Sequence, residues 1–594
     1  MTSQSALPQV QFRASNHGDT VLAGLMYLRD KQQLFDVVLV VQEERLPAHR
    51  VVLASCSDYF RAMFTNGLLE CQQEEVCLNG VTAKGMESLI DFAYTSKLSL
   101  NLDNIEDVLT AANHVQMLPV LKACVNYLKN HMCLENCVDI VSIAELYSLK
   151  NLKKCVQKYI CANFSKLAIS KEILKLSLKQ IHEILDVNFP VDCSECEILS
   201  SVLDWSVLHH ESLSSSGTTD LLSNIKFGDI SSGELERMPN YPIFKKITEE
   251  KSSALLCKIS TEMKNAELDN IGLINKRGFQ QTVVVAGGFS PRNGMTNEIQ
   301  YMHRDECVWK ELTKIPHIQQ CNFGLAVLEN KLYVVGGCYN DNMQEVVHPY
   351  GFCFSPLESS WTPIAPMLLE RCRFFLGSSG GHLYAVGGDP SATDDITSDS
   401  ASCERYDPQN NTWATVSPLP GNRMQHAGIS SDLHLYISGG VQDADDVGLR
   451  DFYQYDTQTD SWTMKASLLT PRADHSMYIY EKCIYIVGGW FQDPQTWQRE
   501  MASTIDRYVI DDDRWETITT VPTPRLYATY TVLDGKLYVI GGWLNGDYQR
   551  KAQQIQMYDL STGRWHDEDN ISLEVWEHSS TVMYIPKSIV SEEG

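Results

Sequence analysis

KLYVVGG, at residues 331–337, is one of six closely similar segments in the C-terminal half of this chain of 594 residues. The other five are QTVVVAGG at 281–288, HLYAVGG at 382–388, HLYISGG at 434–440, CIYIVGG at 483–489 and KLYVIGG at 536–542. The first glycines of successive pairs are separated by 49, 51, 52, 49 and 53 residues. A period near fifty residues indicates one supersecondary unit that is repeated six times.

Each repeat combines a short apolar strand, a glycine pair and an aromatic pair. The β-branched and aromatic runs predict buried strands, and the glycines end them where the backbone passes closely or takes a positive φ. The aromatic pairs that follow are Tyr301 and Trp309, Phe352 or Phe354 and Trp361, Tyr406 and Trp413, Tyr455 and Trp462, Tyr508 and Trp515, and Tyr558 and Trp565. One four-stranded sheet cannot bury both of its faces, whereas six sheets packed radially can. The pattern resembles the kelch β-propeller, and it predicts an all-β, six-bladed domain over residues 281–586.

The first repeat lacks the opening strand that precedes the glycine strand in the others. The missing piece is found at the far end of the domain, in EHSSTVMYIP at residues 577–586. This segment has the pattern of an opening strand. We therefore expect it to pair with QTVVVAGG, so that the first blade closes the ring and leaves no open sheet edge.

The N-terminal half predicts two further domains. FDV at 35–37, AHR at 48–50, SDYF at 57–60 and MF at 63–64 form an ordered set that resembles an α/β BTB domain, expected over residues 19–132. From residue 134 the apolar spacing becomes helical and is similar to the all-α BACK domain, expected over 133–250. A tail at 1–18, a connector at 251–280 and a tail at 587–594 complete the expected organisation.

Composition and charge narrow the class of function. The net charge of −26 argues against nucleic-acid binding as the main role. No apolar run approaches the roughly 20 residues that span a bilayer, so no membrane insertion is expected. The first residues lack the pattern of a signal peptide. We expect a cytoplasmic protein, with nuclear or cytoskeletal sites as alternatives, whose 18 cysteines are mostly small buried residues.

No catalytic, cofactor or metal site is expected from the motifs. Cys193 and Cys196 with His209 and His210 imitate a zinc-finger spacing, but the helix predicted between them holds the two pairs roughly 20 Å apart. Phosphate-binding loops, nucleophile elbows and dinucleotide-binding glycine strings are not found. Some kelch-type propellers are secreted copper oxidases, and this enzyme class is the weakest of the alternatives because no matching Cys, Tyr and His constellation is evident.

The whole chain resembles the BTB–BACK–kelch family, which implies a substrate adaptor of a cullin-3 ubiquitin ligase. The resemblance implies cullin-3 binding through Leu68 and Glu70, with Tyr59, Met63, Phe64 and Tyr94 as neighbours. The alternative is an ordinary helix end with a solvated glutamate. The apolar face of a first helix, formed by Leu22, Leu25 and Met26, predicts a homodimer, because it would otherwise be exposed. The other function left open is a scaffold outside the ligase, associated with actin or with transcription.

The ligand face of the propeller is predicted from register. Sixteen residues before the first glycine, four of five repeats carry an arginine: Arg371, Arg423, Arg472 and Arg525. Aromatic residues follow the glycines at Phe289, Tyr339, Trp490 and Trp543. Arginine forks and exposed rings are typical of binding surfaces, so we expect a target segment that is acidic or phosphorylated. The alternative is that the arginines brace loops through backbone carbonyls.

Overall fold

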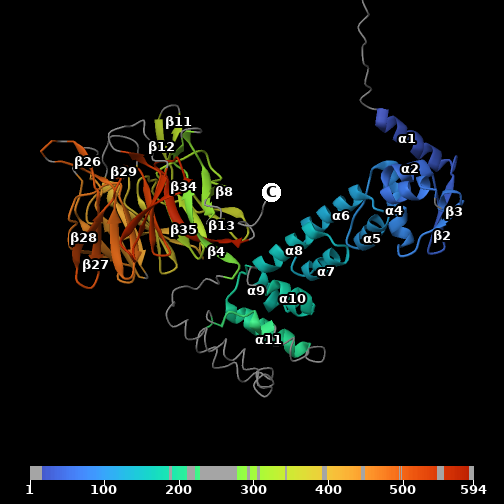
Figure 1. Ribbon diagram of the computed structural model, residues 1–594, viewed down its shortest axis with the longest axis horizontal. Helices are drawn as coiled ribbons and strands as arrows, with labels where there is room; N and C mark the ends of the chain where they lie inside the picture. Colours follow the sequence, from blue (N-terminus) through green and yellow to red (C-terminus); the bar gives the residue numbers. More distant parts are fainter. Residues whose placement is uncertain are drawn as a thin grey trace, which may run out of the picture. The chain divides into compact units, whose positions relative to one another are not determined.

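The structure is a computed structural model that forms two compact units, divided between Ser177 and Leu178 (Figure 1). It describes residues 17–67, 69–185, 190–209, 221–227, 230, 277–290, 294–303, 308–341, 344–390, 398–431, 433–442, 448–493, 495–496, 498–544 and 554–587. Most of the predicted connector therefore lies outside the described residues. None of the helices in these ranges is long and apolar enough to cross a membrane.

The N-terminal unit begins with a small sheet covered by helices. Strand β1 pairs antiparallel with β2 and parallel with β3, in the order β2-β1-β3. The bounds are α1 (His17–Asp30), β1 (Val37–Val41), β2 (Glu44–Ala48), α2 (Arg50–Cys56), α3 (Asp58–Thr65), η1 (Leu69–Cys71), β3 (Glu75–Cys77), α4 (Ala83–Thr95), α5 (Ile105–His114) and α6 (Leu118–Asn130). The alternating burial of β1 places Val37, Leu39 and Val41 in the core. The expected α/β fold is confirmed.

Helices alone follow in this unit and continue into the second. Their bounds are α7 (Cys137–Leu146), α8 (Lys150–Ala162), α9 (Phe164–Ile169), η2 (Glu172–Lys175), α10 (Leu178–Ile184) and α11 (Glu195–Leu208). Helix α11 begins with a complete capping box, because Ser194 and Glu197 bond each other's main-chain amides. It is the helix expected between Cys193 and His209, so those two residues lie at its opposite ends.

A buried ion pair ties α11 to the residue that leads into the propeller. The Arg277 guanidinium donates to both carboxylate oxygens of Glu195, at 2.5 and 2.8 Å, and neither side chain is exposed. Arg277 also donates to the main-chain carbonyl oxygens of Leu185 and Asn224. Each of the three guanidinium nitrogens therefore has a partner, as burial of a charge requires.

Six four-stranded antiparallel sheets make up the described part of the C-terminal domain. The first sheet contains β35 (Ser579–Pro586), β4 (Phe279–Ala286), β7 (Glu298–His303) and β8 (Val308–Lys314), and the second contains β9 (Gly324–Leu328), β10 (Lys331–Val335), β13 (Gly351–Ser355) and β14 (Ser360–Ile364). The third contains β15 (Phe375–Ser379), β16 (His382–Val386), β17 (Cys403–Asp407) and β18 (Thr412–Val416), and the fourth contains β19 (Ala427–Ser431), β20 (His434–Ser438), β21 (Phe452–Asp456) and β22 (Ser461–Met464). The fifth contains β23 (Ser476–Tyr480), β24 (Cys483–Val487), β27 (Thr504–Val509) and β28 (Arg514–Thr520), and the sixth contains β30 (Thr529–Leu533), β31 (Lys536–Ile540), β33 (Gln554–Asp559) and β34 (Arg564–Ser572).

In the described part of the propeller, short hairpins follow three of the glycine pairs. They are β5 (Phe289–Ser290) with β6 (Gly294–Met295), β11 (Cys338–Asp341) with β12 (Gln344–Val347), and β25 (Trp490–Gln492) with β26 (Arg499–Met501). In the sixth repeat β29 (Arg525–Leu526) pairs with β32 (Trp543–Leu544), and the short helix η5 (Ser398–Ala401) precedes β17.

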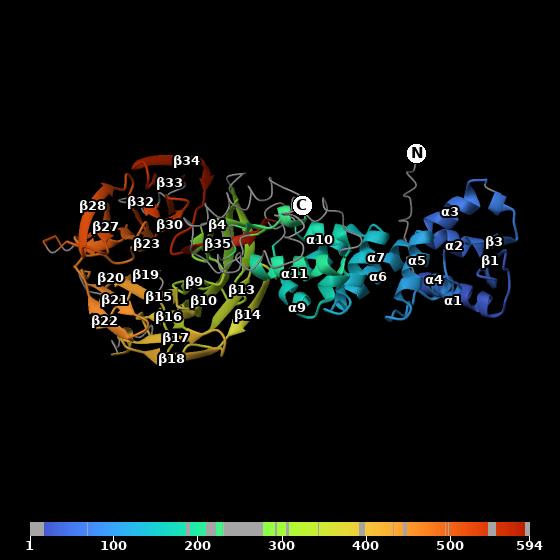
Figure 2. The same ribbon diagram turned by 90° about the horizontal axis from the view of Figure 1, so that it is seen from below.

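The sheets form a closed ring, as predicted. The first strands of neighbouring sheets contact one another in the cycle β9, β15, β19, β23, β30, β35 and back to β9, and Figure 2 shows them near the centre with β18, β22 and β28 at the rim. Strand β35 pairs with β4 over eight residues, from Ser579 opposite Ala286 to Pro586 opposite Phe279. Asn330 also exchanges two 2.9 Å hydrogen bonds with the main chain of Tyr584, which fixes β35 to the second sheet.

The aromatic pairs pack within their sheets, against the neighbouring blade. In repeats two to six the ring centroids of the pair lie 4.8–5.2 Å apart, and in the second repeat the partner of Trp361 is Phe354. In repeats two to five the indole nitrogen bonds the preceding blade; for example, Trp413 donates to the Ala365 carbonyl oxygen and Trp515 to that of Ala466, both at 2.8 Å. The rings therefore supply both buried area and a directional contact between blades.

The glycine pairs are required by backbone geometry. Gly439 and Gly440 both have positive φ, at 58° and 91°. The Gly440 amide donates to the Arg472 carbonyl oxygen of the next repeat at 2.7 Å. A Cβ on Gly439 would lie 2.2 Å from that same oxygen, so the neighbouring blade leaves no space for a side chain.

Candidate functional site

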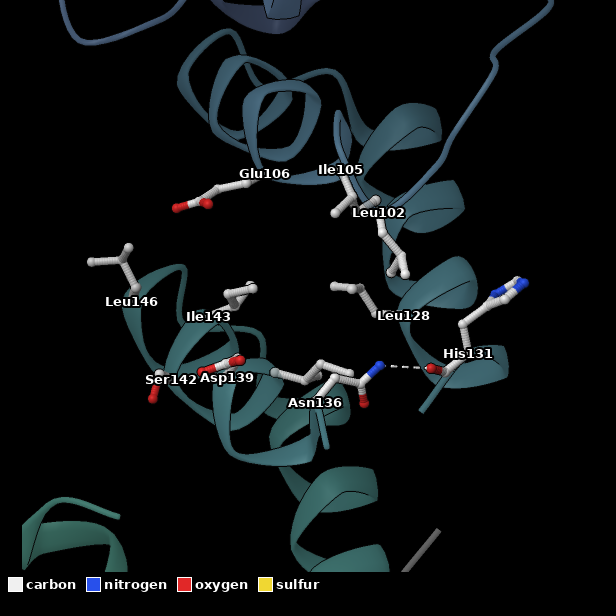
Figure 3. Close-up of a pocket in the computed structure, with 11 residues that line it drawn as sticks. Leu102, Ile105, Glu106, Leu128, His131, Asn136, Asp139, Ser142, Ile143 and Leu146 are labelled. Atoms are coloured by element: carbon white, nitrogen blue, oxygen red, sulfur yellow. Dashed lines mark hydrogen bonds between the residues drawn. The ribbon is translucent and has the colours of Figure 1, made fainter. Parts of the chain in front are cut away.

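The N-terminal unit has an open groove between α5, α6 and α7, with a volume of about 490 Å³ (Figure 3). Its walls are mostly apolar, with acidic side chains on two of the helices. The lining residues are Leu102, Ile105, Glu106, Leu128, His131, Asn136, Asp139, Ile140, Ser142, Ile143 and Leu146. Leu102 and Leu146 are 67% and 73% exposed, so the groove offers apolar surface to a partner.

A second surface lies at the end of α3 and at η1. Tyr59, Phe64 and Glu70 are partly exposed there, and Arg50 covers the Phe64 ring with its guanidinium carbon 4.7 Å from the centroid. Leu69, which the sequence did not single out, is 81% exposed. Leu68 lies outside the described residues.

Helix α5 connects this surface to the groove. Tyr59 packs against His114 at the C-terminal end of α5, with the ring centroids 5.5 Å apart. Further along α5, Thr110 and Tyr147 bond through their hydroxyls at 2.5 Å, which fixes the end of α7. One helix thus supports both features, and they form one side of the unit.

Two of the residues predicted to neighbour the cullin lie in the core instead. Tyr94 has no exposed surface: its hydroxyl accepts from the His49 amide at 2.9 Å and contacts the His49 ring nitrogen Nδ1 at 2.6 Å. Burial raises the pKa of this phenol. Met63 is only 8% exposed. The resemblance suggested Tyr94 as a neighbour of the cullin contact, but Tyr94 lies on the inner face of α4, so its assignment to the surface is wrong.

The first helix presents an apolar surface. No residue of α1 is buried, and Val21, Met26 and Tyr27 are 47%, 42% and 60% exposed. Leu22 and Leu25 are half-buried. The helix is held to α4 by an ion pair between Arg29 and Asp91, at 2.6 Å.

The four propeller arginines are buried, and their assignment to the ligand face is wrong. Arg371, Arg423, Arg472 and Arg525 are 0–4% exposed. Each donates through Nη1 to the carbonyl oxygen of the first glycine of its own repeat, at 2.9–3.2 Å. They brace the glycine turns through backbone carbonyls, which was the alternative reading of the sequence.

Acidic partners compensate the charge of three of these arginines. Arg371 is 2.6 Å from Glu404, and Arg472 is 2.6 Å from Asp506, with both carboxylates at most 1% exposed. Arg423 is 3.3 Å from Asp451. Paired, buried charges attract no external anion. The expectation of an acidic or phosphorylated target therefore loses its basis.

The residues that follow the glycine pairs lie at one end of the ring. Each forms an antiparallel β-bridge with a residue shortly before an opening strand. The bridged pairs are Phe289 with Trp576, Cys338 with Cys321, Asp389 with Cys372, Val441 with Met424, Trp490 with Ala473, and Trp543 with Leu526. Trp490 is 3% exposed and donates to Asp474, so it is a core residue here and its assignment as an exposed anchor is wrong.

Other aromatic side chains at this end are accessible. Phe289, Trp543 and Trp576 are partly exposed, and the Trp576 ring stacks on Phe289 at 6.0 Å and meets Trp543 edge-on at 4.8 Å. Tyr339 is also partly exposed and packs against His317. Trp576 was missed by the sequence reading because it belongs to the segment that closes the ring.

Six residues in equivalent positions of the repeats, at this end of the ring, have backbones in the left-handed region. They are Asn322, Arg373, Gln425, Asp474, Tyr527 and Glu577, with φ from 50° to 55°. Main-chain bonds join neighbours, for example the Asp474 amide to the Gln425 carbonyl oxygen at 2.8 Å. Burial, and then the nearby Asp474, raise the pKa of Glu577.

A compact set of metal-ligand types occurs at the same end. The donor atoms of Cys338, Glu345 and Cys372 all lie within 4.8 Å of one another. The sequence reading expected no metal site, and it did not align these residues. A signal was present, since Cys321 and Cys372 both stand fifteen residues before a glycine pair in neighbouring repeats.

Four family models match separate stretches of the chain. Residues 25–132 match the BTB/POZ domain, and residues 137–239 match BACK, or BTB And C-terminal Kelch. Residues 321–368 match the Kelch motif, and residues 374–587 match the KLHDC2/KLHL20/DRC7 Kelch-repeats domain.

Known proteins with the same organisation are similar along almost all of the chain. Kelch-like protein 26 of Danio rerio is 30% identical over 588 residues, which cover 95% of this chain and 92% of that protein. Kelch-like protein 36 of Rattus norvegicus is 28% identical over 92% of this chain and 89% of its own length. Kelch-like protein 15 of Mus musculus is 28% identical over 94% of each. The chain therefore belongs to the Kelch-like family of proteins, which join BTB, BACK and kelch domains.

Proposed function

We propose that this chain is a non-catalytic substrate receptor of a cullin-3 ubiquitin ligase. The observation that carries the proposal is that α5 contacts Tyr59 at one end, through His114, and lines the apolar groove at the other, through Ile105 and Glu106. A groove with exposed leucines beside a charged helix end fits an amphipathic segment of a partner protein.

In this proposal the propeller captures the target. The aromatic cluster of Phe289, Trp543 and Trp576 offers a place for an apolar anchor side chain, because rigid rings give large contact area at small entropic cost. Glu577 and Asp474 lie in equivalent positions two repeats apart at the same end, and a cationic group of the target would relieve their mutual repulsion. We therefore propose a target segment with apolar and basic side chains.

The chain contributes proximity to the reaction. It holds the target and the cullin on one molecule, so that transfer of ubiquitin by the partner enzymes becomes effectively intramolecular. Dimerisation through α1 would double the number of target sites in one complex and would raise avidity for targets with repeated segments.

Two sets of substitutions in the full chain separate the two binding activities. Glu70→Ala with Leu146→Asp should weaken binding to the N-terminal domain of cullin-3 by at least about tenfold, since each removes an interface group worth about 1–2 kcal/mol. Trp543→Ala with Trp576→Ala should leave cullin binding unchanged and deplete the proteins recovered by proximity labelling. Calorimetry measures the first effect and quantitative mass spectrometry the second.

A matched control is available for each set. Ile169→Asp changes an exposed apolar side chain on α9, outside the groove, and Ile518→Ala changes one on β28, at the rim of the ring. Unaltered cullin affinity of the groove variant would reject the ligase proposal in favour of the scaffold function. An unaltered set of labelled proteins for the tryptophan variant would move the capture surface elsewhere.

A further inference from the structure

Three potential ligands from two neighbouring blades, Cys338, Glu345 and Cys372, meet beside Phe289, and a fourth, Cys321, lies next to Cys338. Cys321 and Cys338 face each other across an antiparallel contact, with main-chain N···O distances of 2.9 and 3.0 Å. The hairpin of β11 and β12 returns Glu345 over Cys338, and Cys372 comes from the start of the next blade. The three cysteines are buried and Glu345 is partly exposed.

The separation of two of the sulfur atoms fits a tetrahedral thiolate site. Cys321 Sγ and Cys338 Sγ are 3.7 Å apart. Thiolates bound at about 2.3 Å to a tetrahedral zinc ion lie about 3.8 Å from each other. The donor atoms of Cys338, Glu345 and Cys372 also lie within 4.8 Å of one another, with 2.7 Å from the Cys338 thiol to the Glu345 carboxylate.

The surrounding groups match what such a site needs. The Asn322 side-chain amide lies 3.6 Å from Cys321 Sγ and 3.8 Å from Cys338 Sγ, where it donates to both sulfurs. Donors of this kind orient thiolates and stabilise their charge. The Arg373 guanidinium lies 3.5 Å from Glu345 and 4.0 Å from Asp389, so a positive charge offsets the excess of anionic ligands.

We propose that Cys321, Cys338, Cys372 and Glu345 form a structural zinc site that joins the second and third blades of the propeller. Zinc is the divalent cation that combines thiolate and carboxylate ligands in tetrahedral sites. When zinc binds, the thiol protons are released to solvent. The charge of the ion is the same when it is bound and when a chelator removes it, so no oxidant is involved. The partly exposed carboxylate gives the ion a path of entry.

The test uses the full chain, stripped of metal with a chelator in the presence of a reductant. Zinc should bind at one site per chain with a Kd below about 100 nM, measured by competition with a chromophoric chelator. Cobalt(II) at the same site should give a thiolate charge-transfer absorption band. Zinc should also raise the unfolding temperature of the propeller, because only the folded chain brings the ligands together.

Three variants identify the ligands. Cys338→Ser should weaken zinc binding at least about 100-fold and remove the charge-transfer band, and Glu345→Gln should weaken it at least about tenfold. Cys483→Ser, a partly exposed cysteine on β24, is the control and should bind like the wild type.

Several results would overturn the zinc site. One is a cobalt complex of the wild-type chain without the thiolate band, which does not depend on how any variant folds. Another is wild-type zinc affinity in Cys338→Ser. A third is a reduced chain that takes up no zinc while peptide mapping of the air-exposed chain finds Cys321 linked to Cys338, since the cluster would then be a redox pair.

Discussion

At the scale of single residues, register alone left the role of the propeller arginines open. Equivalent spacing places Arg371 and Arg472 at equivalent points of the ring, but it does not say whether their side chains point outward or into a blade. The acidic partners, Glu404 and Asp506, lie 33 and 34 residues further on, in the third strand of the same sheet. A search for a carboxylate at that distance would have indicated buried pairs, because an unpaired buried guanidinium is too costly.

Loss of one of these arginines should therefore destabilise the propeller. Arg472→Met leaves Asp506 buried without its partner and removes the brace on Gly488, so the unfolding free energy should fall by about 3–5 kcal/mol. Thermal unfolding followed by calorimetry measures the change.

Arg514→Met is the matched control, since its ion pair with Asp512 is more than half exposed and should contribute less than about 1 kcal/mol. Equal unfolding temperatures for the two variants would contradict the structural role assigned to Arg472.

At the scale of elements, the sequence was most informative where a segment needed a partner. The first repeat lacks a strand and residues 577–586 form a strand without a repeat, so their pairing followed from the cost of an open edge. The resemblance that placed Tyr94 beside the cullin contact could not show whether its face of the helix is exposed or covered. Here α4 turns that face to the core, and His49 satisfies the phenol.

Helix α1 remains an element with an apolar face to cover. Val21→Asp with Met26→Asp should raise the dissociation constant of the dimer by more than about tenfold, because each exposed apolar side chain contributes about 1.5–3 kcal/mol when buried. Analytical sedimentation of the full chain over a range of concentrations measures it.

Ile169→Asp, on α9, serves as the control for added negative charge. If the double variant dimerises as tightly as the wild type, the dimer forms through a surface other than α1.

At the scale of the whole molecule, combinations of repeats were the hardest to foresee. The zinc ligands come from two consecutive blades, and the packing of these blades brings Cys372 next to Cys338. The closure of the ring adds His578 to the equivalent positions of His426 and His475, all of them buried. Burial lowers the pKa of His426 and of His578 to about 3 and that of His475 well below its usual range, with Arg423 and Arg472 adding to the effect at His426 and His475.

These histidines make the propeller sensitive to acid. Their pKa values are near 6.5 in the unfolded chain, so between pH 6.5 and about 3 the unfolded chain binds protons that the folded chain cannot. The contribution of these histidines to the free energy of unfolding is fully present above pH 6.5. It should fall as the pH decreases, by on the order of 1 kcal/mol per histidine at pH 5.5. Calorimetry between pH 7.5 and 5.5 should show a drop of several degrees in the unfolding temperature.

A natural replacement tests the cause. The second and third repeats carry Phe323 and Phe374 in the position of His426, so His426→Phe should flatten the dependence on pH whatever its effect on stability at pH 7.5. A slope identical to that of the wild type would assign the acid sensitivity to other groups.

Because β35 closes the ring, the first blade cannot be completed until the end of the domain has been translated. Strand β4 leaves the ribosome first, but its partner β35 begins 293 residues after Ala286, from 286 to 579. At roughly 5–20 residues per second, translation of that stretch takes about 15–60 s. During that interval the first blade has only three strands and one unpaired edge. Nascent chains therefore need protection from pairing with one another until β35 has been translated.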